Sequence, residues 1–343
     1  MEVYIDKENL RSFIRARNDS RYKDYYDDCY RMLKRQLHIN YNFSKTRELL
    51  EDEELKNYFM LSGQGNGDSE ADTYIEEMFP NRPVKANIAN EFDKRQRSAV
   101  YLIDDEKTKL VIEKGALLIG ESGTELATLN RLFCGSDYDF HKLYNIQNPK
   151  SFASWGQLKE DKLNLPLSDI ILMDRYLGTD LDLAPYNLFK LLDVLVDGVR
   201  DKVNVVLLCS KEYYNKNDKR TYSPDWEKFR KEIKDLLKKK TGFGCYVTFV
   251  FYTQDKNLHD RTILTNYMLF RSGDSFYYYN SRGDVISKGN SLDVDSLAKK
   301  SNFDYAMSFI EMVQNLCDKI YGLNPDNILG DKKSNYIRFS EQL

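Results

Sequence analysis

Short apolar runs alternate with longer amphipathic segments in the second half of the chain. Val203–Cys209 and Tyr246–Tyr252 are almost continuously apolar or aromatic, which is typical of strands covered on both faces. Tyr186–Val196 and Trp226–Lys239 carry apolar residues at helical spacing. Further strands are expected at Ser168–Met173, Thr262–Phe270 and Ser275–Asn280, and a mainly helical segment at Asp293–Ile320. Because strands alternating with helices predict βαβ units, we expect an α/β domain with a mostly parallel sheet and helices on both faces.

The first 150 residues have a different pattern, and we expect a mainly helical, mixed region there. Helices are expected at Lys7–Arg17, Arg21–Gln36, Asp52–Phe59 and Thr124–Phe133, and strands at Ser98–Ile103 and Lys109–Ile112. The polar stretch Gly135–Asn164 separates this region from the α/β part. We therefore divide the chain into an N-terminal region over residues 1–150, a domain over residues 166–321 and a tail over residues 322–343.

Composition and charge narrow the class of protein. Hydrophobic residues make up 41% of the chain, which is enough for a core and excludes a wholly disordered protein. The net charge of −3 argues against general coating of nucleic acid, although it leaves room for a local basic patch. No apolar run approaches the ~20 residues of a membrane span, and the charged N-terminus is unlike a secretory signal. We expect a cytoplasmic protein, and the many Tyr, Asn, Asp and Lys residues suit an AT-rich bacterial genome.

The cysteines and histidines argue against a metal site. Five cysteines are widely spaced without a CxxC pair, and the chain has three histidines. Cys209 and Cys245 lie in or beside apolar runs, so we interpret them as reduced core thiols. We expect neither a metal nor another cofactor.

A lysine-rich run, Lys231–Lys240, overlaps the predicted helix Trp226–Lys239. The ordinary interpretation is a solvated helix face, since the same helix also has an apolar face. Contacts with a phosphate backbone are the sharper alternative, and they would give binding that weakens steeply with salt.

The most informative motif contains His259, Asp260 and Arg261, with Asn266 and Gly273 further along. Side chains alternate along a strand, so His259 and Arg261 are expected on the same face. Arginine offers a planar fork of donors to a phosphate, and histidine can donate a proton or attack. A structural hydrogen-bond cluster of these three residues at a sheet edge is an equally good interpretation.

The spacing His259-x-Arg261-x4-Asn266 resembles the HxKx4D signature of the phospholipase D superfamily, with Arg for Lys and Asn for Asp. The order of expected elements over residues 166–321 also resembles one half of that fold. The version that it resembles most is the C-terminal domain of an MIT-domain, ESCRT-associated protein, whose motif also begins His-Asp-Arg. That domain is regarded as a binding module, so the resemblance implies binding of a phosphate ligand or a partner.

The departures from the family pattern imply a degenerate site. In the family, two HxK motifs act together: one His forms a phosphohistidine, the other protonates the leaving oxygen, and the Lys residues clamp the phosphoryl group. This chain offers one such motif, at His259, so hydrolysis would need a symmetric homodimer. Asn266 cannot act as the carboxylate that orients the imidazole. Arg261 could still bind phosphate.

Asp174 and Arg175 directly follow the expected strand Ser168–Met173. In open α/β sheets, ligands bind outside the carboxyl ends of the strands. Asp174 could therefore pair with His259 or Arg261 across the sheet. The alternative is that Asp174 caps the next loop and that Arg175 is a surface residue. With Asp260 and Gly273, these two residues complete the candidate ligand-binding set.

Three hypotheses about function follow. The preferred one is a bacterial protein that binds a phosphate ligand, nucleic acid or a protein partner through a non-hydrolytic phospholipase D-like domain, with an accessory or effector role in a defence system. The second is a dimeric, metal-independent nuclease or phosphodiesterase, in which His259 is the nucleophile, Arg261 the clamp and Asn266 the third motif residue. The third is a structural interaction protein without a small ligand.

Overall fold

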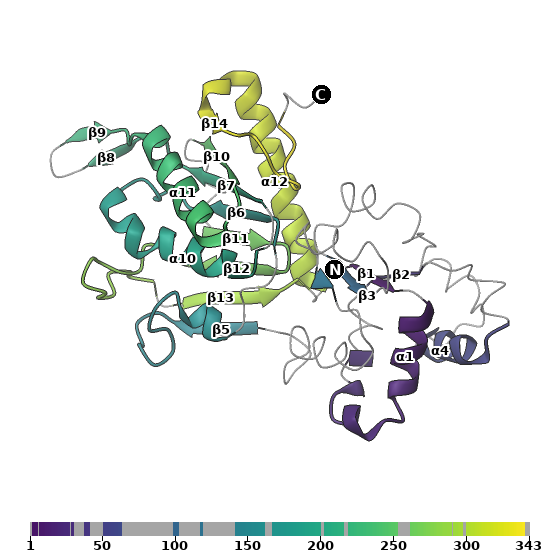
Figure 1. Ribbon diagram of the computed structural model, residues 1–343. Coiled ribbons are helices and arrows are strands. Elements are labelled where there is room, and N and C mark those ends of the chain that lie inside the picture. Colours follow the sequence, from purple (N-terminus) through teal and green to yellow (C-terminus); the bar gives the residue numbers. More distant parts are fainter. Residues whose placement is uncertain are drawn as a thin grey trace. The chain divides into compact units, whose positions relative to one another are not determined.

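A computed structural model gives the fold of the protein (Figure 1). It describes residues 2–5, 7–27, 29–30, 38–41, 51–63, 99–102, 117–118, 141–161, 167–199, 202–215, 219–252, 261–289, 291–297 and 300–339. The chain divides into two compact units, Met1–Phe140 with Ser296–Phe303 and His141–Asp295 with Asp304–Leu343. The main point of division therefore lies inside the polar stretch Gly135–Asn164.

The first unit contains a parallel four-stranded sheet in the order β2-β1-β3-β4. Its elements are β1 (Glu2–Ile5), α1 (Lys7–Ala16), η1 (Ser20–Tyr22), β2 (His38–Tyr41), α4 (Glu53–Gly63), β3 (Ala99–Leu102) and β4 (Leu117–Leu118). Helices α1 and α4 and strand β3 confirm three of the predicted segments. The prediction lacks β1 and β2, whose charged and polar residues Glu2, His38 and Asn40 interrupt the apolar pattern that marks β3. The predicted segments Lys109–Ile112 and Thr124–Phe133 lie outside the described residues. Of the predicted helix Arg21–Gln36, residues 28 and 31–36 also lie outside them, and the described part consists of the end of η1, a turn and the helical residues 26–27 and 29–30.

Aromatic contacts hold α1 against its neighbours in the first unit. Leu10 and Phe13 are buried, and the Phe13 ring stacks on Tyr26 with 5.1 Å between centroids. Tyr58 of α4 meets the Phe13 ring edge-on at 6.5 Å. The guanidinium of Arg11 also forms an ion pair with Asp52, just before α4. An apolar contact and a charged contact thus connect the same two helices.

The second unit is built on a mixed eight-stranded sheet in the order β14-β10-β7-β6-β11-β12-β13-β5. The strands are β5 (His141–Asn145), β6 (Asp169–Met173), β7 (Val203–Cys209), β10 (Cys245–Phe251), β11 (Arg261–Thr265), β12 (Met268–Ser272), β13 (Ser291–Ser296) and β14 (Ile328–Gly330). Strands β6, β7 and β10 are parallel. In contrast, β11 is antiparallel to β6 and β12, β14 to β10, and β13 to β5. The α/β class is confirmed, but the expectation of a mostly parallel sheet is wrong.

A tight turn explains much of this difference. The predicted strand Thr262–Phe270 is in fact two strands, β11 and β12, which are joined by Asn266 and Tyr267. A connection of two residues forces its strands to be antiparallel, whereas parallel strands need a long crossover. The Thr265 hydroxyl accepts the Met268 backbone N–H at 3.1 Å and stabilises the turn. Apolar residues on both sides hide this turn in the sequence pattern.

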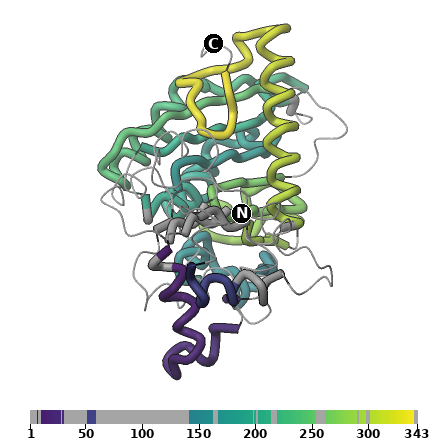
Figure 2. Tube along the Cα trace, turned by 90° about the vertical axis from the view of Figure 1, so that its right-hand side faces the viewer, coloured from purple at the N-terminus to yellow at the C-terminus, as the bar shows by residue number. Residues whose placement is uncertain are grey.

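Helices cover both faces of the eight-stranded sheet (Figures 1 and 2). Helices α10 (Leu188–Leu195) and α11 (Trp226–Thr241) lie on one face, and α12 (Lys300–Leu323) lies on the other. The inward face of α11 consists of Trp226, Phe229, Ile233 and Leu237, and that of α12 includes Ala306, Phe309, Val313 and Cys317. Their spacing of three and four residues is that of an amphipathic helix. The predicted helices Tyr186–Val196 and Trp226–Lys239 are confirmed.

Two other predicted segments are corrected. Ser275–Asn280 forms no ladder strand, and its one β-bridge joins Tyr279 to Val285. Its three consecutive tyrosines are buried, and their hydroxyls donate to groups inside the protein, so the segment is core without being a strand. The start of the predicted helix Asp293–Ile320 is also wrong, because residues up to Ser296 belong to β13 and the helix begins at Lys300.

The C-terminal segment belongs to the second unit and is not a separate tail. Strand β14 adds to the edge of β10, and the next residue, Asp331, accepts the Val247 backbone N–H at 2.8 Å. Asn335 donates to the carboxylate of Asp169 at 2.7 Å, at the start of β6. These contacts attach the segment to β10 and to the amino end of β6.

Two further expectations concern the core and membranes. Cys209, Cys245 and Cys317 are buried free thiols, as expected for the first two, and Cys29 is buried as well. None of the helices in the described ranges combines the length and the hydropathy of a membrane-crossing segment.

Candidate functional site

One edge of the second sheet gathers several of the candidate residues. The parallel strands β6, β7 and β10 end there, and the antiparallel strand β11 begins there. Thr262 pairs with Met173, so Arg261 stands next to Asp174. Strand β12 ends at the same edge, and Arg261 Nη1 donates to the carbonyl oxygen of Gly273 at 3.5 Å. The structure therefore brings Asp174, Arg261 and Gly273 to one place.

Two guanidinium groups lie near one exposed aromatic ring at this edge. Tyr176 is 39% exposed, and its ring centroid lies 5.5 Å from Cζ of Arg261 and 5.9 Å from Cζ of Arg175. A guanidinium on an aromatic ring gains a cation–π attraction, and its planar fork of five N–H groups can also donate to an oxyanion. We call Arg175, Tyr176 and Arg261 the arginine–tyrosine edge. It combines positive charge with a flat apolar ring.

Asp174 supports this edge from below. Asp174 is 1% exposed. Its carboxylate accepts hydrogen bonds from the Tyr176 N–H at 2.9 Å, the Ser275 hydroxyl at 2.7 Å and the Phe276 N–H at 2.9 Å. Burial raises the pKa of Asp174, while these hydrogen bonds and nearby Arg261 act in the opposite direction. The contacts match the loop-capping interpretation, and the carboxylate also supplies negative charge near Arg261.

Residues outside the predicted set fix the backbone of the edge. The Tyr213 hydroxyl donates to the Arg175 carbonyl at 2.8 Å and accepts the Gly178 N–H at 3.0 Å. A Cβ atom on Gly178 would lie 2.4 Å from a ring carbon of Trp226 and 2.6 Å from one of Tyr213. Gly178 therefore allows the loop to approach two buried rings. A glycine shortly after a buried strand is the signal that could have pointed to this loop.

Asn266 lies at the opposite end of β11 from Arg261. It is fully buried, and its side-chain oxygen accepts the backbone N–H groups of Ser168 at 2.9 Å and Asp169 at 3.2 Å. A strand rises about 3.3 Å per residue, so five residues separate the two ends by roughly 16 Å. Two residues of the motif, Arg261 and Asn266, therefore lie at opposite ends of β11. Asn266 connects β11 to the start of β6 and does not reach the arginine–tyrosine edge.

The other motif residues divide into two groups. His259 and Asp260 lie outside the described residues, so the nucleophile assigned to His259 stays a prediction. Gly273 is exposed after β12, and a Cβ atom there would meet nothing within 4 Å. Its carbonyl oxygen accepts the hydrogen bond from Arg261, and a residue with a side chain would also fit at this position.

The charge of the edge suits an anion. Within the described ranges, no group of three or more His, Cys, Asp or Glu side chains could hold a metal ion.

No protein-family model matches the sequence, and no curated protein matches it either. The fold and this geometry define the class of protein as α/β, with a cationic, aromatic edge at the carboxyl ends of its parallel strands.

Proposed function

We propose that the protein binds phosphate groups of single-stranded nucleic acid at the arginine–tyrosine edge. The observation that carries this proposal is the exposed Tyr176 ring with two guanidinium carbons at 5.5 and 5.9 Å from its centroid. A single strand presents phosphates and unstacked bases side by side. The guanidinium groups of the edge can bind the phosphates, and the tyrosine ring can stack on a base.

The chemistry of the three side chains supports this ligand class. Guanidinium groups bind phosphate oxygens through charge-assisted, often bidentate hydrogen bonds. An aromatic ring can stack on any base, and such stacking contributes about 1–3 kcal/mol per base. The net charge of −3 means that attraction must come from this local group of positive charges and not from the whole protein.

The position of the edge in the fold gives a second line of support. Ligands of open α/β sheets bind outside the carboxyl ends of parallel strands. Arg175 follows β6 at that end, and the sheet order places Arg261 of β11 alongside. Hydrogen bonds from the Ser210 N–H and the Tyr213 hydroxyl to the Arg175 carbonyl hold the loop in place. A loop that is already held in place loses less entropy when a ligand binds.

We further propose that this domain is a degenerate phospholipase D-like domain that does not hydrolyse its ligand. The sequence has one HxR motif where the family uses two HxK motifs. The oxygen of Asn266 accepts two backbone N–H groups, and this residue supports the sheet at the far end of β11. Arg261 is thus the motif residue that remains suited to phosphate.

The test is a binding titration of a labelled single-stranded oligonucleotide, followed by fluorescence anisotropy at low salt. We expect Arg175→Ala, Arg261→Ala and Tyr176→Ala each to weaken binding about tenfold, as for loss of one charged hydrogen bond or one stacked base. Arg338→Ala is the matched control, since Arg338 is an exposed arginine on the C-terminal segment. Circular dichroism checks that each variant keeps its fold.

The outcomes separate the three hypotheses. No binding by the wild type, or equal binding by the three edge variants, would overturn the proposal and favour a structural interaction protein. Cleavage of the oligonucleotide in the presence of a chelator, abolished by His259→Ala, would overturn the non-hydrolytic part and favour the dimeric phosphodiesterase.

A further inference from the structure

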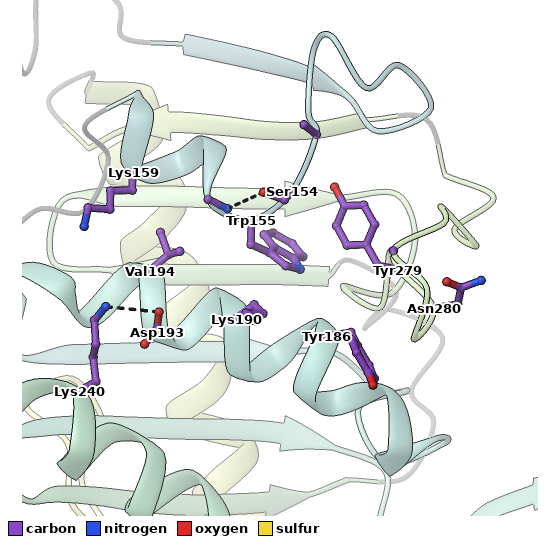
Figure 3. A pocket seen from close by; sticks show the side chains of 13 residues that line it. Ser154, Trp155, Lys159, Tyr186, Lys190, Asp193, Val194, Lys240, Tyr279 and Asn280 are labelled. Carbon is purple, nitrogen blue, oxygen red and sulfur yellow. Dashed lines mark hydrogen bonds and ion pairs between the residues drawn. The ribbon is translucent and has the colours of Figure 1, made fainter.

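A second site of different character lies in the same unit, on the face of the sheet that α10 and α11 cover. A cavity of about 470 Å³ opens beside α10, among residues of the segment before α9 (Gln157–Glu160), of η4 (Leu181–Tyr186) and of the loop after Tyr279. We call it the Trp155 cavity, and its functional lining is Trp155, Lys159, Tyr186, Lys190, Lys240 and Tyr279 (Figure 3). Its volume falls in the range of about 300–1,000 Å³ that is usual for small-molecule sites.

The indole N–H of Trp155 is a buried donor that has no acceptor among the described residues. Trp155 is 2% exposed, and its Nε1 atom makes no hydrogen bond within the described part of the chain. The ring cannot easily turn to find one, because it stacks on Tyr278 at 4.8 Å and meets Phe152 edge-on at 5.4 Å. An unsatisfied buried donor is costly and calls for an acceptor, which a bound water, ion or ligand can supply.

The walls around this donor are fixed by hydrogen bonds. The Asn187 side chain accepts the Tyr279 backbone N–H at 2.9 Å and donates to the Tyr279 carbonyl at 2.7 Å. The Tyr279 hydroxyl donates to the Phe152 carbonyl at 3.2 Å. Figure 3 shows the Trp155 indole between Tyr279 on one side and Lys190 and Tyr186 on the other. Hydrogen bonds therefore fix the position of Tyr279, which forms the wall of the cavity next to Trp155.

The charges around the cavity leave one cation uncompensated. Lys240 pairs with Asp193 at 3.3 Å and with Asp197 at 2.9 Å, and Lys159 pairs with Asp197 at 2.8 Å. These two lysines and two aspartates balance. Lys190, which lies on α10 between Tyr186 and Asp193, forms no ion pair with any residue of the described ranges. The site thus has an ammonium group available for an anion.

An exposed ring completes the set of recognition groups. Tyr186 ends η4 and is 40% exposed, and it lines the cavity together with Lys190 of α10. A planar ring can stack on an aromatic ligand. The cavity therefore offers an aromatic surface, an ammonium group and a buried N–H donor to the same ligand.

We propose that the Trp155 cavity binds a nucleoside monophosphate. Its phosphate would be held by Lys190, its base would stack on Tyr186, and an acceptor atom would receive the Trp155 N–H. This binding is separate from the arginine–tyrosine edge and does not rest on the function proposed for that edge.

The proposal is tested by isothermal titration calorimetry with the full chain and four ribonucleoside 5′-monophosphates. We expect at least one to bind with a Kd below about 1 mM, and its nucleoside and inorganic phosphate alone to bind about tenfold more weakly. Lys190→Gln and Trp155→Phe should each weaken binding about tenfold. Lys231→Gln, an exposed lysine on α11 outside the cavity, should bind like the wild type.

The proposal is overturned if no monophosphate binds, if inorganic phosphate binds as well as the nucleotide, or if Lys190→Gln binds like the wild type. Trp155 is part of the core, so its variant is first checked by thermal unfolding. Should Trp155→Phe not fold, the exposed Tyr186→Leu replaces it, and unchanged affinity in that variant counts against the proposal equally.

Discussion

The hydroxyl of Ser275 donates a hydrogen bond of 2.7 Å to the carboxylate of Asp174, although 101 residues separate the two in the chain. The same carboxylate oxygen accepts the Phe276 backbone N–H at 2.9 Å. This relationship ties the irregular segment Ser275–Asn280 to the carboxyl end of β6. It also explains why a buried carboxylate lies directly beneath the arginine–tyrosine edge.

Replacement of Asp174 by Asn should therefore destabilise the second unit. An amide has one acceptor oxygen, so at least one of the N–H or O–H donors around it would face an NH2 group. An unsatisfied buried polar group costs about 1–3 kcal/mol, and we expect the free energy of unfolding in urea to fall by about that amount. Asp235→Asn, at an exposed position on α11, is the control. Equal urea midpoints for both variants would contradict this account.

Gly178→Ala should disturb the same loop by overpacking. The new methyl group would lie 2.4 Å from a ring carbon of Trp226 and 2.6 Å from a ring carbon of Tyr213. Overpacking in a filled core costs about 1–3 kcal/mol, and the thermal unfolding temperature should fall accordingly. Gly273→Ala is a matched control at the same edge, because its methyl group would meet nothing within 4 Å. Comparable losses in both variants would show that the loop is not closely packed at Gly178.

The central elements of the second unit could be predicted because their sequence pattern is local. Val203–Cys209 is a strand with the predicted limits, and Trp226–Lys239 lies within α11. Strands β5 and β14 could not be predicted in this way. They are short and polar or partly exposed, and their hydrogen-bond partners are β13 and β10, which are distant in the chain.

The candidate site was predictable to a similar degree. The rule that ligands bind at the carboxyl ends of strands identifies Asp174 and Arg175, and the alternation of a strand identifies Arg261. The exposed ring of Tyr176 could not be predicted, because exposure of a tyrosine depends on the tertiary packing around it. The Trp155 cavity could not be predicted either, since its walls come from segments that no local pattern connects.

Asn266 offers a test that separates a structural role from a catalytic one. Asn266→Ala removes the acceptor for the Ser168 and Asp169 N–H groups, so the free energy of unfolding should fall by about 1–3 kcal/mol. Folded Asn266→Ala protein should bind single-stranded nucleic acid like the wild type, because this residue lies at the far end of β11. Asn266→Asp restores the family residue, and we expect no cleavage from it. Chelator-resistant cleavage by that variant would reverse this interpretation.

Asp274 should make stability dependent on pH in the acid range. Burial acts to raise the pKa of Asp274, but hydrogen bonds from the backbone N–H groups of Ser275, Lys288 and Gly289 outweigh it and lower the pKa. A carboxylate with a lowered pKa stabilises the fold above its unfolded value of about 3.9, and this stability is lost as the pH falls through the folded pKa. Urea unfolding at about pH 6 and pH 3 should therefore show a smaller difference for Asp274→Asn than for the wild type. An identical difference would contradict this role.

Salt dependence gives the most specific signature of the arginine–tyrosine edge. Each phosphate neutralised on a single strand contributes about −0.7 to the slope of log K against log salt. Arg175→Ala and Arg261→Ala should each make the slope less negative by about that amount, because each removes one phosphate contact. Tyr176→Ala should weaken binding at every salt concentration and leave the slope unchanged, since stacking releases no counterion. Arg338→Ala should change neither affinity nor slope. If the two arginine variants keep the wild-type slope while their affinity falls, the guanidinium groups act on the ring or the fold and not on phosphate, and the proposed binding mode is wrong.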